Sequence, residues 1–565
     1  MTSTTIARSI SSEDWPPWSR FGEWIHSICV VTFDLELGQA LEVMYPGDAV
    51  LSSQEKSNIC YLAFPDSNCA SSTDTKYHFR IRRSSCDLSP SQRLFTLNAP
   101  SSLPFHSQFL YGFVHFRQQR DSSLPRGYYQ KSVVLVTVLP LFHLFSVVIE
   151  RIAFGFFDMG EAVIEAACHD IDQWPSPCAG HSFHLPLMGS VIQCRLPSSS
   201  DLPFGHSQDI KIDSSDGFIT LNSVFEPDLY RNLSTVVRHI QLLWELVLLG
   251  EPLLVIASGP ARTSSIVQSL VALISPLRYS NDFRPYFTIH DSEFREYTGR
   301  SKNPARVILG VTNPFFVKAL DHWPHILKVG EYCTEEGVAE TKQEKARKHW
   351  DGRTLDAKPG LFTQFKPFLQ KDDALMKKLS KDRPDDVHSA VLQRHLLELT
   401  QSFMIPLERY LSSLMPLRKQ MNPFKSVPNA RSFSMDDFLS TLDEAGPSLT
   451  CGVKGDWNGL YRRFMHSPSF AAWLSSRSTC MASQLKILYI DALCEADLGK
   501  EVLAHKHHVE IVDLVLRIRQ RVTELDVSSP KRILLTKQIK CILECVDEDL
   551  RSVLMSNCSL REILA

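Results

Sequence analysis

The sequence lacks the features that mark membrane-spanning, disulfide-bonded and nucleic-acid-binding proteins. No apolar run reaches the roughly 20 residues that a transmembrane helix needs, and the most apolar stretch, 132–157, is interrupted by Pro140, His143, Glu150 and Arg151. The 14 cysteines form no CxxC pair and no dense framework, so we expect reduced core cysteines in a cytoplasmic protein. The net charge of −3 is not the basic surplus typical of a general nucleic-acid binder. The first residues contain no apolar segment typical of a signal peptide.

Motifs of common catalytic and nucleotide-binding sites are also missing: GxxxxGK[ST], GxGxxG, HExxH and GxSxG do not occur. The turn Ser258-Gly259-Pro260 follows an apolar strand, but one glycine and a proline cannot supply the row of N–H donors that cradles a phosphate. His505, His507 and His508 lack a matching cysteine or carboxylate spacing, which favours a solvated loop over a metal site. We therefore expect no cofactor, no metal and no bond chemistry of the protein's own. An α/β enzyme whose site assembles from distant positions remains an alternative.

The N-terminal part alternates in the manner of an antiparallel sheet. Ser27–Asp34 is a strong strand, Gly38 marks a turn and 39–45 is a second strand, which together predict a hairpin. Ser52 and Glu55 form a capping-box pattern that opens a helix ending near Ala63. Further strands are predicted at 77–83, 94–98, 109–116 and 132–139, and an apolar helix at 142–156. This order predicts a small antiparallel sheet flanked by helices.

The pattern changes after a polar stretch, 197–217, that is typical of a linker. A buried helix at 236–249 is expected to end at Gly250. Strands predicted at 253–257, 286–290 and 306–312 alternate with helical segments such as 263–275, which indicates a mostly parallel sheet. A charged, exposed loop is expected at 331–360, and helices at 387–414, 460–474, 509–525 and 533–554.

These patterns predict a multidomain chain that mixes α/β and α+β architecture. The expected parts are a disordered tail, an upstream sheet lobe, a linker, a central α/β lobe and an all-helical downstream region, at 1–20, 21–195, 196–218, 219–370 and 371–565.

Polar and aromatic residues collect near the ends of the central strands. In open α/β sheets, ligand and partner sites lie beyond the carboxyl ends of the strands, so this edge is the candidate partner-binding surface. Simpler roles compete at each position: Asp291 and Asn313 are suitable helix caps, Phe315 could pack in the core, and Arg284 could only pair with Asp282. The candidate residues are Phe283, Arg284, Asp291, Asn313 and Phe315.

Several segments resemble DENN-domain proteins. LLWELVLLGEPLLVIASGPAR, SPLRYSNDFRPYFTIHDSEFREY and GVTNPFFVKALDHWPHI resemble the central segment of that family. CVVTFDLELGQALEVMYP and GDWNGLYRRFMHSPSFAAWL resemble its type-6 subfamily. The resemblance runs from about Ser27 to Leu474. It implies a longin-like upstream lobe, a central α/β lobe and a helical downstream part.

The resemblance also implies a function. Similar family members are guanine nucleotide exchange factors for Rab small GTPases, and the type-6 group is associated with a Rab of endosomal recycling. A cytoplasmic protein with peripheral association with recycling endosomes is then expected. Such a protein would bind the GTPase between its two lobes. Asp34, Glu36 and Gly38 of the hairpin turn are therefore weaker candidates for partner-binding residues.

Two expectations follow. Replacing Arg284 by alanine should slow nucleotide release without loss of thermal stability. The alternative function is a Rab-binding scaffold or effector without exchange activity.

Overall fold

The structure is a computed structural model of the chain. It describes residues 18–34, 36, 38–66, 74–123, 127–201, 210–213, 217–299, 305–330, 359–442, 447, 452–526 and 529–564. Most of the expected tail and of the expected loop at 331–360 lies outside the described residues. The chain divides into two compact units: a first unit, Met1–Ser402 with Ser448–Ser469, and a second unit, Phe403–Pro447 with Phe470–Ala565. None of the described helices is both long enough and apolar enough to cross a bilayer.

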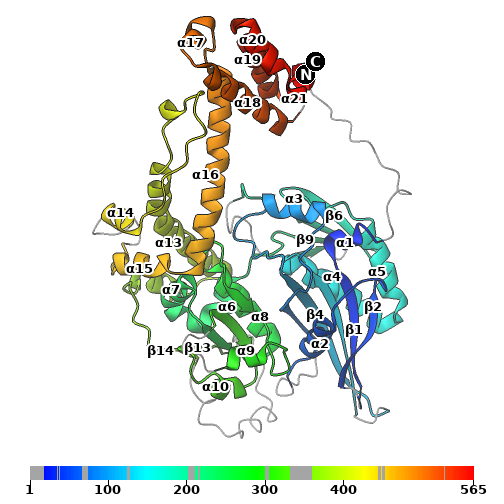
Figure 1. Cartoon of the computed structure of the whole chain (residues 1–565). Coiled ribbons are helices and arrows are strands. Elements are labelled where there is room, and N and C mark those ends of the chain that lie inside the picture. Colours follow the sequence, from blue (N-terminus) through cyan, green and yellow to red (C-terminus); the bar gives the residue numbers. More distant parts are fainter. Residues whose placement is uncertain are drawn as a thin grey trace. The chain divides into compact units, whose positions relative to one another are not determined.

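An antiparallel five-stranded sheet forms the upstream lobe, in the order β2-β1-β5-β4-β3 (Figure 1). The predicted hairpin and antiparallel sheet are confirmed. The strands are β1 (Ser27–Asp34), β2 (Gly38–Tyr45), β3 (Thr75–Arg82), β4 (Phe109–Arg120) and β5 (Tyr128–Thr137), and the helices are α1 (Phe21–Trp24), α2 (Ser53–Leu62), α3 (Pro90–Asn98), α4 (Phe142–Met159) and α5 (Ala162–Asp172).

Local capping explains one success and one error in this lobe. The predicted capping box at Ser52 and Glu55 opens α2. The strand predicted at 94–98 is wrong, because these residues belong to helix α3. A second capping box, between Ser89 and Gln92, opens α3 with Pro90 at the first helical position, where its missing N–H costs nothing. The signal was present in the sequence and outweighs the local strand pattern.

A smaller sheet that the sequence did not predict follows, with strand order β6-β7-β9-β8. Its strands are β6 (Ser182–Leu187), β7 (Ser190–Arg195), β8 (Ile210–Asp213) and β9 (Phe218–Leu221). The stretch expected to be a linker therefore contains a strand, β8. Short strands in a Ser/Pro-rich context give little periodic signal.

The central lobe is built on a second five-stranded sheet, in the order β11-β12-β10-β13-β14. The first four strands are parallel and β14 is antiparallel, which confirms a mostly parallel sheet. Gly250 ends α7 in the left-handed conformation, φ 66°, as predicted. The strands are β10 (Leu253–Ile256), β11 (Asp282–Arg284), β12 (Val307–Val311), β13 (His325–Lys328) and β14 (Gly360–Thr363), and the helices are α6 (Leu229–Leu233), the 3₁₀ helix η3 (Ser234–His239), α7 (Ile240–Leu249), α8 (Pro260–Ala272), α9 (Phe294–Thr298) and α10 (Phe315–Ala319).

The strand predicted at 286–290 is wrong, since the strand is β11 and ends before Pro285. Proline has no N–H to donate to a ladder. Beyond Pro285 the backbone still lies beside β12, where the Phe287 N–H donates a hydrogen bond to the Gly310 carbonyl at 2.8 Å. Tyr286 and Phe287 are fully buried, so these aromatic side chains pack in the core without belonging to a strand.

The downstream part is helical, as predicted, but two expected helices are split. The helix expected at 460–474 covers the end of α15 and the start of α16, and the helix expected at 533–554 covers α19 and α20. The core of the second unit lies around Leu514, Ile518, Leu535 and Ile539. The helices are α12 (Asp373–Leu379), α13 (Asp385–Ser413), η4 (Arg418–Gln420), α14 (Met435–Ser440), α15 (Trp457–Met465), α16 (Pro468–Glu495), α17 (Lys500–Ala504), α18 (His508–Glu524), α19 (Pro530–Cys545), α20 (Glu548–Met555) and α21 (Cys558–Leu564).

Candidate partner-binding surface

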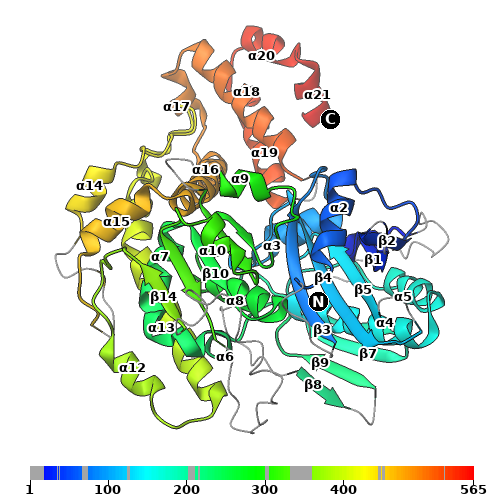
Figure 2. The ribbon, with the colours of Figure 1, turned by 90° about the horizontal axis from the view of Figure 1, so that it is seen from below.

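Two arginines join the edge of the upstream sheet to the edge of the central sheet. Figure 2 shows β3 running beside the central lobe. Arg80 of β3 donates Nη1–H to the Phe283 carbonyl at 3.2 Å, and Arg284 of β11 donates Nη1–H to the Arg80 carbonyl at 3.1 Å. These reciprocal bonds cover two strand edges that would otherwise be open to other chains. We call this junction the seam; it comprises Arg80, Arg82, Asp282, Phe283, Arg284, Glu293 and Glu296.

Opposite charges are packed along the seam. Asp282 lies 3.0 Å from both Arg80 and Arg284, and Arg284 also pairs with Glu293. Arg82, which is half-exposed, reaches Glu293 at 3.0 Å and Glu296 at 3.2 Å. The Arg80 guanidinium also stacks 3.5 Å from the ring centre of Phe109 and 4.1 Å from that of Phe283. Each arginine therefore bonds to the lobe opposite its own, so separating the lobes would leave several charges without partners.

The acids of the seam respond differently to burial. Burial raises the pKa of Glu293 and of Asp291, although Arg284 counteracts both shifts. Burial also acts to raise the pKa of Asp282, but Arg284 and Arg80 outweigh it and hold that pKa below its usual range. Asp282 is therefore the ionised centre of the seam.

A second set of contacts joins helix α2 to the loop that follows β11. Ser292 N–H donates to Asn58 Oδ1 at 3.2 Å, and Asn58 Nδ2 donates back to Ser292 Oγ at 3.0 Å. Tyr61 stacks on His290 with 5.1 Å between ring centres. Together with the seam, these bonds join the upstream lobe to the central lobe at two separate points.

A third contact lies where α2 ends and β12 ends. Thr312 Oγ1 donates to Asp66 Oδ2 at 2.7 Å, and the Asp66 N–H donates to the Tyr286 hydroxyl at 2.9 Å. Burial raises the pKa of Asp66, against the lowering effects of the Thr312 bond and of nearby His290. His290 and Thr312 therefore approach the same carboxylate.

Three of the predicted residues are buried. Phe283, Arg284 and Asp291 are 2%, 1% and 4% exposed, so their side chains do not lie on the surface of the joined lobes. Arg284 pairs with Asp282, as the simpler reading allowed, and also with Glu293. Asp291 accepts the Glu293 N–H at 2.9 Å ahead of α9. The expectation that Arg284 can be removed without loss of stability is inconsistent with this burial.

The other two central candidates are accessible. Asn313 is partly exposed, and its side-chain oxygen accepts the Phe315 N–H at 2.9 Å just ahead of α10, whose N-cap position is Pro314. Phe315 is 49% exposed, and it is the neighbouring Phe316 that enters the core. Sequence reasoning did not single out Tyr61 and Asp66 of the upstream lobe, which are partly exposed, or Ile289 and His290 of the central lobe, which are exposed. We call the accessible residues of both lobes the seam surface: Tyr61, Asp66, Ile289, His290, Asn313 and Phe315.

The hairpin turn borders this surface. Asp34 and Glu36 are exposed, and the Asp34 carboxylate accepts the Glu36 N–H at 2.7 Å. Gly38 has φ 77°, a left-handed value that glycine adopts without strain. Phe33 packs edge-on against Phe64, with 6.4 Å between ring centres. The turn is thus tied to the segment that carries Asp66.

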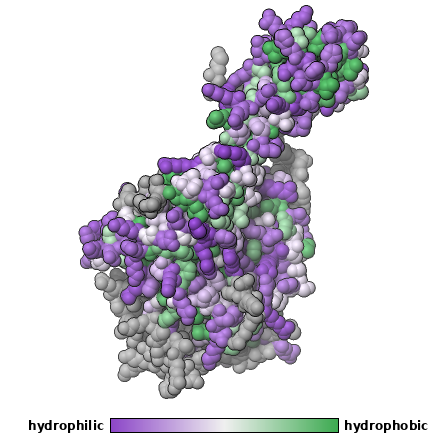
Figure 3. All heavy atoms as spheres, turned by 60° about the vertical axis from the view of Figure 1, so that its left-hand side comes forward, coloured by the Kyte–Doolittle hydropathy of each residue, from purple (hydrophilic) through white to green (hydrophobic). Residues whose placement is uncertain are grey.

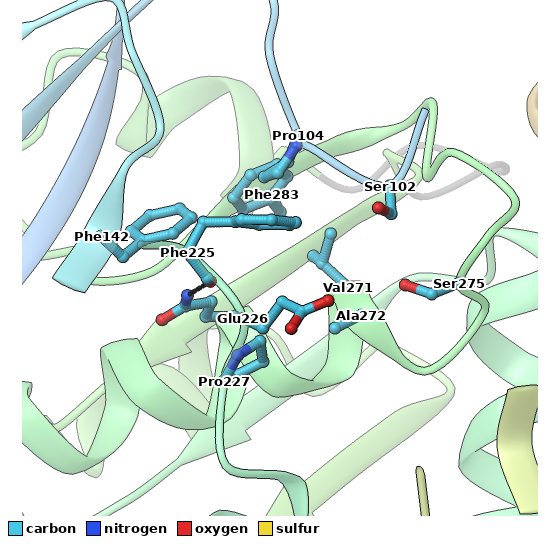
Figure 4. Close-up of a pocket in the computed structure, with 11 residues that line it drawn as sticks. Ser102, Pro104, Phe142, Phe225, Glu226, Pro227, Val271, Ala272, Ser275 and Phe283 are labelled. Atoms are coloured by element: carbon cyan, nitrogen blue, oxygen red, sulfur yellow. Dashed lines mark hydrogen bonds between the residues drawn. The ribbon is translucent and has the colours of Figure 1, made fainter. Parts of the chain in front are cut away.

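A narrow cavity lies behind the seam, between the two lobes (Figure 4). Phe142, Phe225 and Phe283 line it with Glu226, and Gln268 Nε2 donates to the Phe225 carbonyl at 2.7 Å. Its volume is about 20 Å³, enough for a water molecule and too small for a nucleotide or other organic ligand. Within the described part of the chain, no cluster of three or more His, Cys, Asp or Glu side chains is arranged to hold a metal ion.

Comparison with known proteins finds relatives that cover most of the chain. The family described as "DENN (AEX-3) domain" matches residues 128–320, "Transport protein Avl9" matches residues 25–165, and "DENND6 C-terminal domain" matches residues 498–557. Protein DENND6A of Gallus gallus is 48% identical, over 95% of this chain and 94% of its own length. Human Protein DENND6B is 47% identical with the same coverage, and the DENND6 homolog of Dictyostelium discoideum is 32% identical over 88% of this chain.

Proposed function

The chain belongs to the DENND6 group of DENN-domain proteins, and from that premise we propose that it is a guanine nucleotide exchange factor for a Rab small GTPase. The observation that carries the proposal is the seam surface, which both lobes build and which buried ion pairs hold in one arrangement. A surface prepared in this way binds a partner with little ordering of its own side chains.

In this mechanism, exchange occurs because the protein binds the nucleotide-free GTPase more tightly than the nucleotide-bound form. By thermodynamic linkage, it then weakens the affinity of the GTPase for its nucleotide by the same factor. GTP, when in excess over GDP, refills the empty site and releases the exchange factor. No nucleophile or metal of this chain takes part.

The candidate residues divide into two roles under this proposal. Phe315 and Asn313 contact the GTPase from the central lobe, since exposed aromatic side chains are frequent anchors of interfaces. Asp34, Glu36 and Gly38 contact it from the upstream hairpin. Phe283, Arg284 and Asp291 do not touch the GTPase; they position the two lobes behind the seam surface.

We further propose that the protein acts in endosomal recycling and associates peripherally with the endosomal membrane. The proposal rests on family membership. Imaging of the tagged full-length chain beside markers of recycling and late endosomes tests it, and enrichment on late endosomes alone would contradict it.

The competing function is that of a Rab-binding scaffold or effector. The nucleotide state of the Rab that the chain prefers distinguishes it from an exchange factor. The test uses a panel of purified Rabs, each nucleotide-free, GDP-loaded or GTP-loaded, captured on the immobilised full chain. An exchange factor retains its cognate Rab best in the nucleotide-free state. Preferential retention of the GTP-loaded state would instead support the effector and refute the exchange proposal.

A further inference from the structure

Helix α19 of the second unit, Pro530–Cys545, presents a basic stripe that also carries exposed apolar side chains. Ile533, Lys537 and Lys540 follow one another at helical spacing and are all exposed. Ile533 is 67% exposed and its neighbour Leu534 48%. On the opposite side of the helix, Leu535, Ile539, Ile542 and Leu543 enter the core of the unit. We call Arg532, Ile533, Leu534, Thr536, Lys537 and Lys540 the α19 face.

The charge of this helix is local and unbalanced. Lys531, Arg532, Lys537 and Lys540 oppose one carboxylate, Glu544, which gives α19 a net charge of 4 − 1 = +3 in a chain whose net charge is −3. Lys531 pairs with Asp491 of α16, and Arg532 donates to the Leu525 carbonyl at 3.3 Å. In the described part of the chain, Lys537 and Lys540 take part in no ion pair. These two lysines are therefore available to an outside anion.

The shape of the face distinguishes between kinds of partner. A shallow hollow on it is lined by five residues that all belong to α19, so no second element forms a wall against which a peptide could dock. Elsewhere in the same unit a walled groove of about 440 Å³ does exist, lined by residues of α13, α16, α18 and the segment 427–433. The hollow is therefore open at its sides, and Figure 3 shows apolar patches among polar side chains on the surface of the C-terminal helices. Such a face fits a broad surface better than a chain segment.

We propose that the α19 face binds the surface of an anionic lipid bilayer. Lys537, Lys540 and Arg532 lie against the lipid phosphates and carboxylates, while Ile533 and Leu534 enter the boundary between headgroups and acyl chains. An amphipathic helix with lysines beside apolar side chains lies in the plane of a membrane in this way. The proposal is independent of nucleotide exchange, because it concerns another unit of the chain and needs no GTPase.

Vesicle co-sedimentation of the full-length chain tests the proposal. Vesicles of phosphatidylcholine with 30% phosphatidylserine are compared with vesicles of phosphatidylcholine alone, at about 0.15 M salt. The chain is expected to bind the anionic vesicles only. Lys537→Gln with Lys540→Gln should weaken binding about fivefold for each charge removed. Lys377→Gln with Lys378→Gln on α12, where both lysines are also exposed, is the matched control and should bind as the wild type does.

The double variant Ile533→Ser with Leu534→Ser keeps the charge of the α19 face. It therefore distinguishes binding to a membrane from binding to a soluble polyanion. These residues are exposed, so the variant should fold normally. It should lose vesicle binding but keep any binding to heparin beads. No binding of the wild-type chain to anionic vesicles, equal binding by the lysine variant, or retention on heparin alone would each overturn the proposal.

Discussion

Arg284 gives the sharpest prediction about the fold, because its guanidinium is the buried centre of the seam. Replacing it by alanine removes bonds to Asp282, Glu293 and the Arg80 carbonyl and leaves two acids in a poorly solvated place. Breaking a buried pair by removal of one partner costs about 3–5 kcal/mol. Arg80 and Arg82 still reach the two acids, so we expect a loss of about 3 kcal/mol in the free energy of unfolding.

The loss should depend on pH in a defined direction. In the wild type, the lowered pKa of Asp282 stabilises the fold above the unfolded value of about 3.9, and this contribution is lost as pH falls through the folded pKa. In Arg284→Ala, Asp282 and Glu293 each lose one of their cationic partners, so their pKa values rise and protonation relieves the variant. The stability difference from wild type should therefore be larger at pH 7.5 than at pH 5.

Urea unfolding followed by tryptophan fluorescence measures this effect. Eight of the nine tryptophans belong to the first unit, all but Trp473, so the signal reports mainly on the unit that contains the seam. Arg295→Ala is the control, because Arg295 is exposed on the nearby helix α9; its stability should change by less than about 0.5 kcal/mol. If Arg284→Ala were as stable as this control at pH 7.5, the reasoning about the seam would be refuted.

Three further substitutions probe the site, a buried acid and the packing behind the site. Phe315→Ala should lower kcat/KM for exchange about 30-fold, the effect of a hot spot worth about 2 kcal/mol. Phe362 is the control, because it has similar exposure and lies on the edge strand β14, and Phe362→Ala should leave kcat/KM unchanged. Equal effects of the two substitutions would exclude Phe315 as a contact. Burial raises the pKa of Glu245 to about 7. Between about pH 4.5 and 7 the Glu245 carboxyl therefore keeps its proton in the native state, whereas the unfolded chain has lost it. The free energy of unfolding should fall by about 3 kcal/mol as pH rises through this window. Urea titrations of Glu245→Gln should show a flatter profile, and an unchanged slope would contradict this account. Gly310→Ala should destabilise the chain by about 2–3 kcal/mol, measured by the same unfolding assay, because a Cβ there would lie 2.4 Å from the Pro285 carbonyl oxygen; wild-type stability would show that the backbone can move away.

Local signals in the sequence predicted local structure well. The capping box at Ser52 and the left-handed Gly250 depend on residues a few positions apart, and both are confirmed. The alternation of strands and helices likewise predicted the mostly parallel central sheet. Two of the errors arose where local signals competed, as in α3, or where buried aromatic residues packed outside a strand, as at Tyr286 and Phe287.

The candidate site depended on contacts that no local pattern contains. Asn58 and Ser292 are 234 positions apart, and nothing in either segment announces the other. Phe283 and Arg284 belong to the edge strand β11, a place where the sequence alone allows either a surface or a buried junction. Only the approach of β3, with Arg80, makes them interior. The sequence could thus predict the edge of the sheet but not which side chains remain accessible on it.

The most direct test of the account is release of a fluorescent GDP analogue from a panel of purified Rabs, with catalytic amounts of the full-length chain. We predict that the wild type accelerates release from one Rab or a few related Rabs, and that Phe315→Ala is slower on the same Rab while Phe362→Ala is not. Acceleration that Phe315→Ala and Phe362→Ala retain equally would place the contact elsewhere on the chain. No acceleration for any member of a complete Rab panel would contradict the proposed function itself.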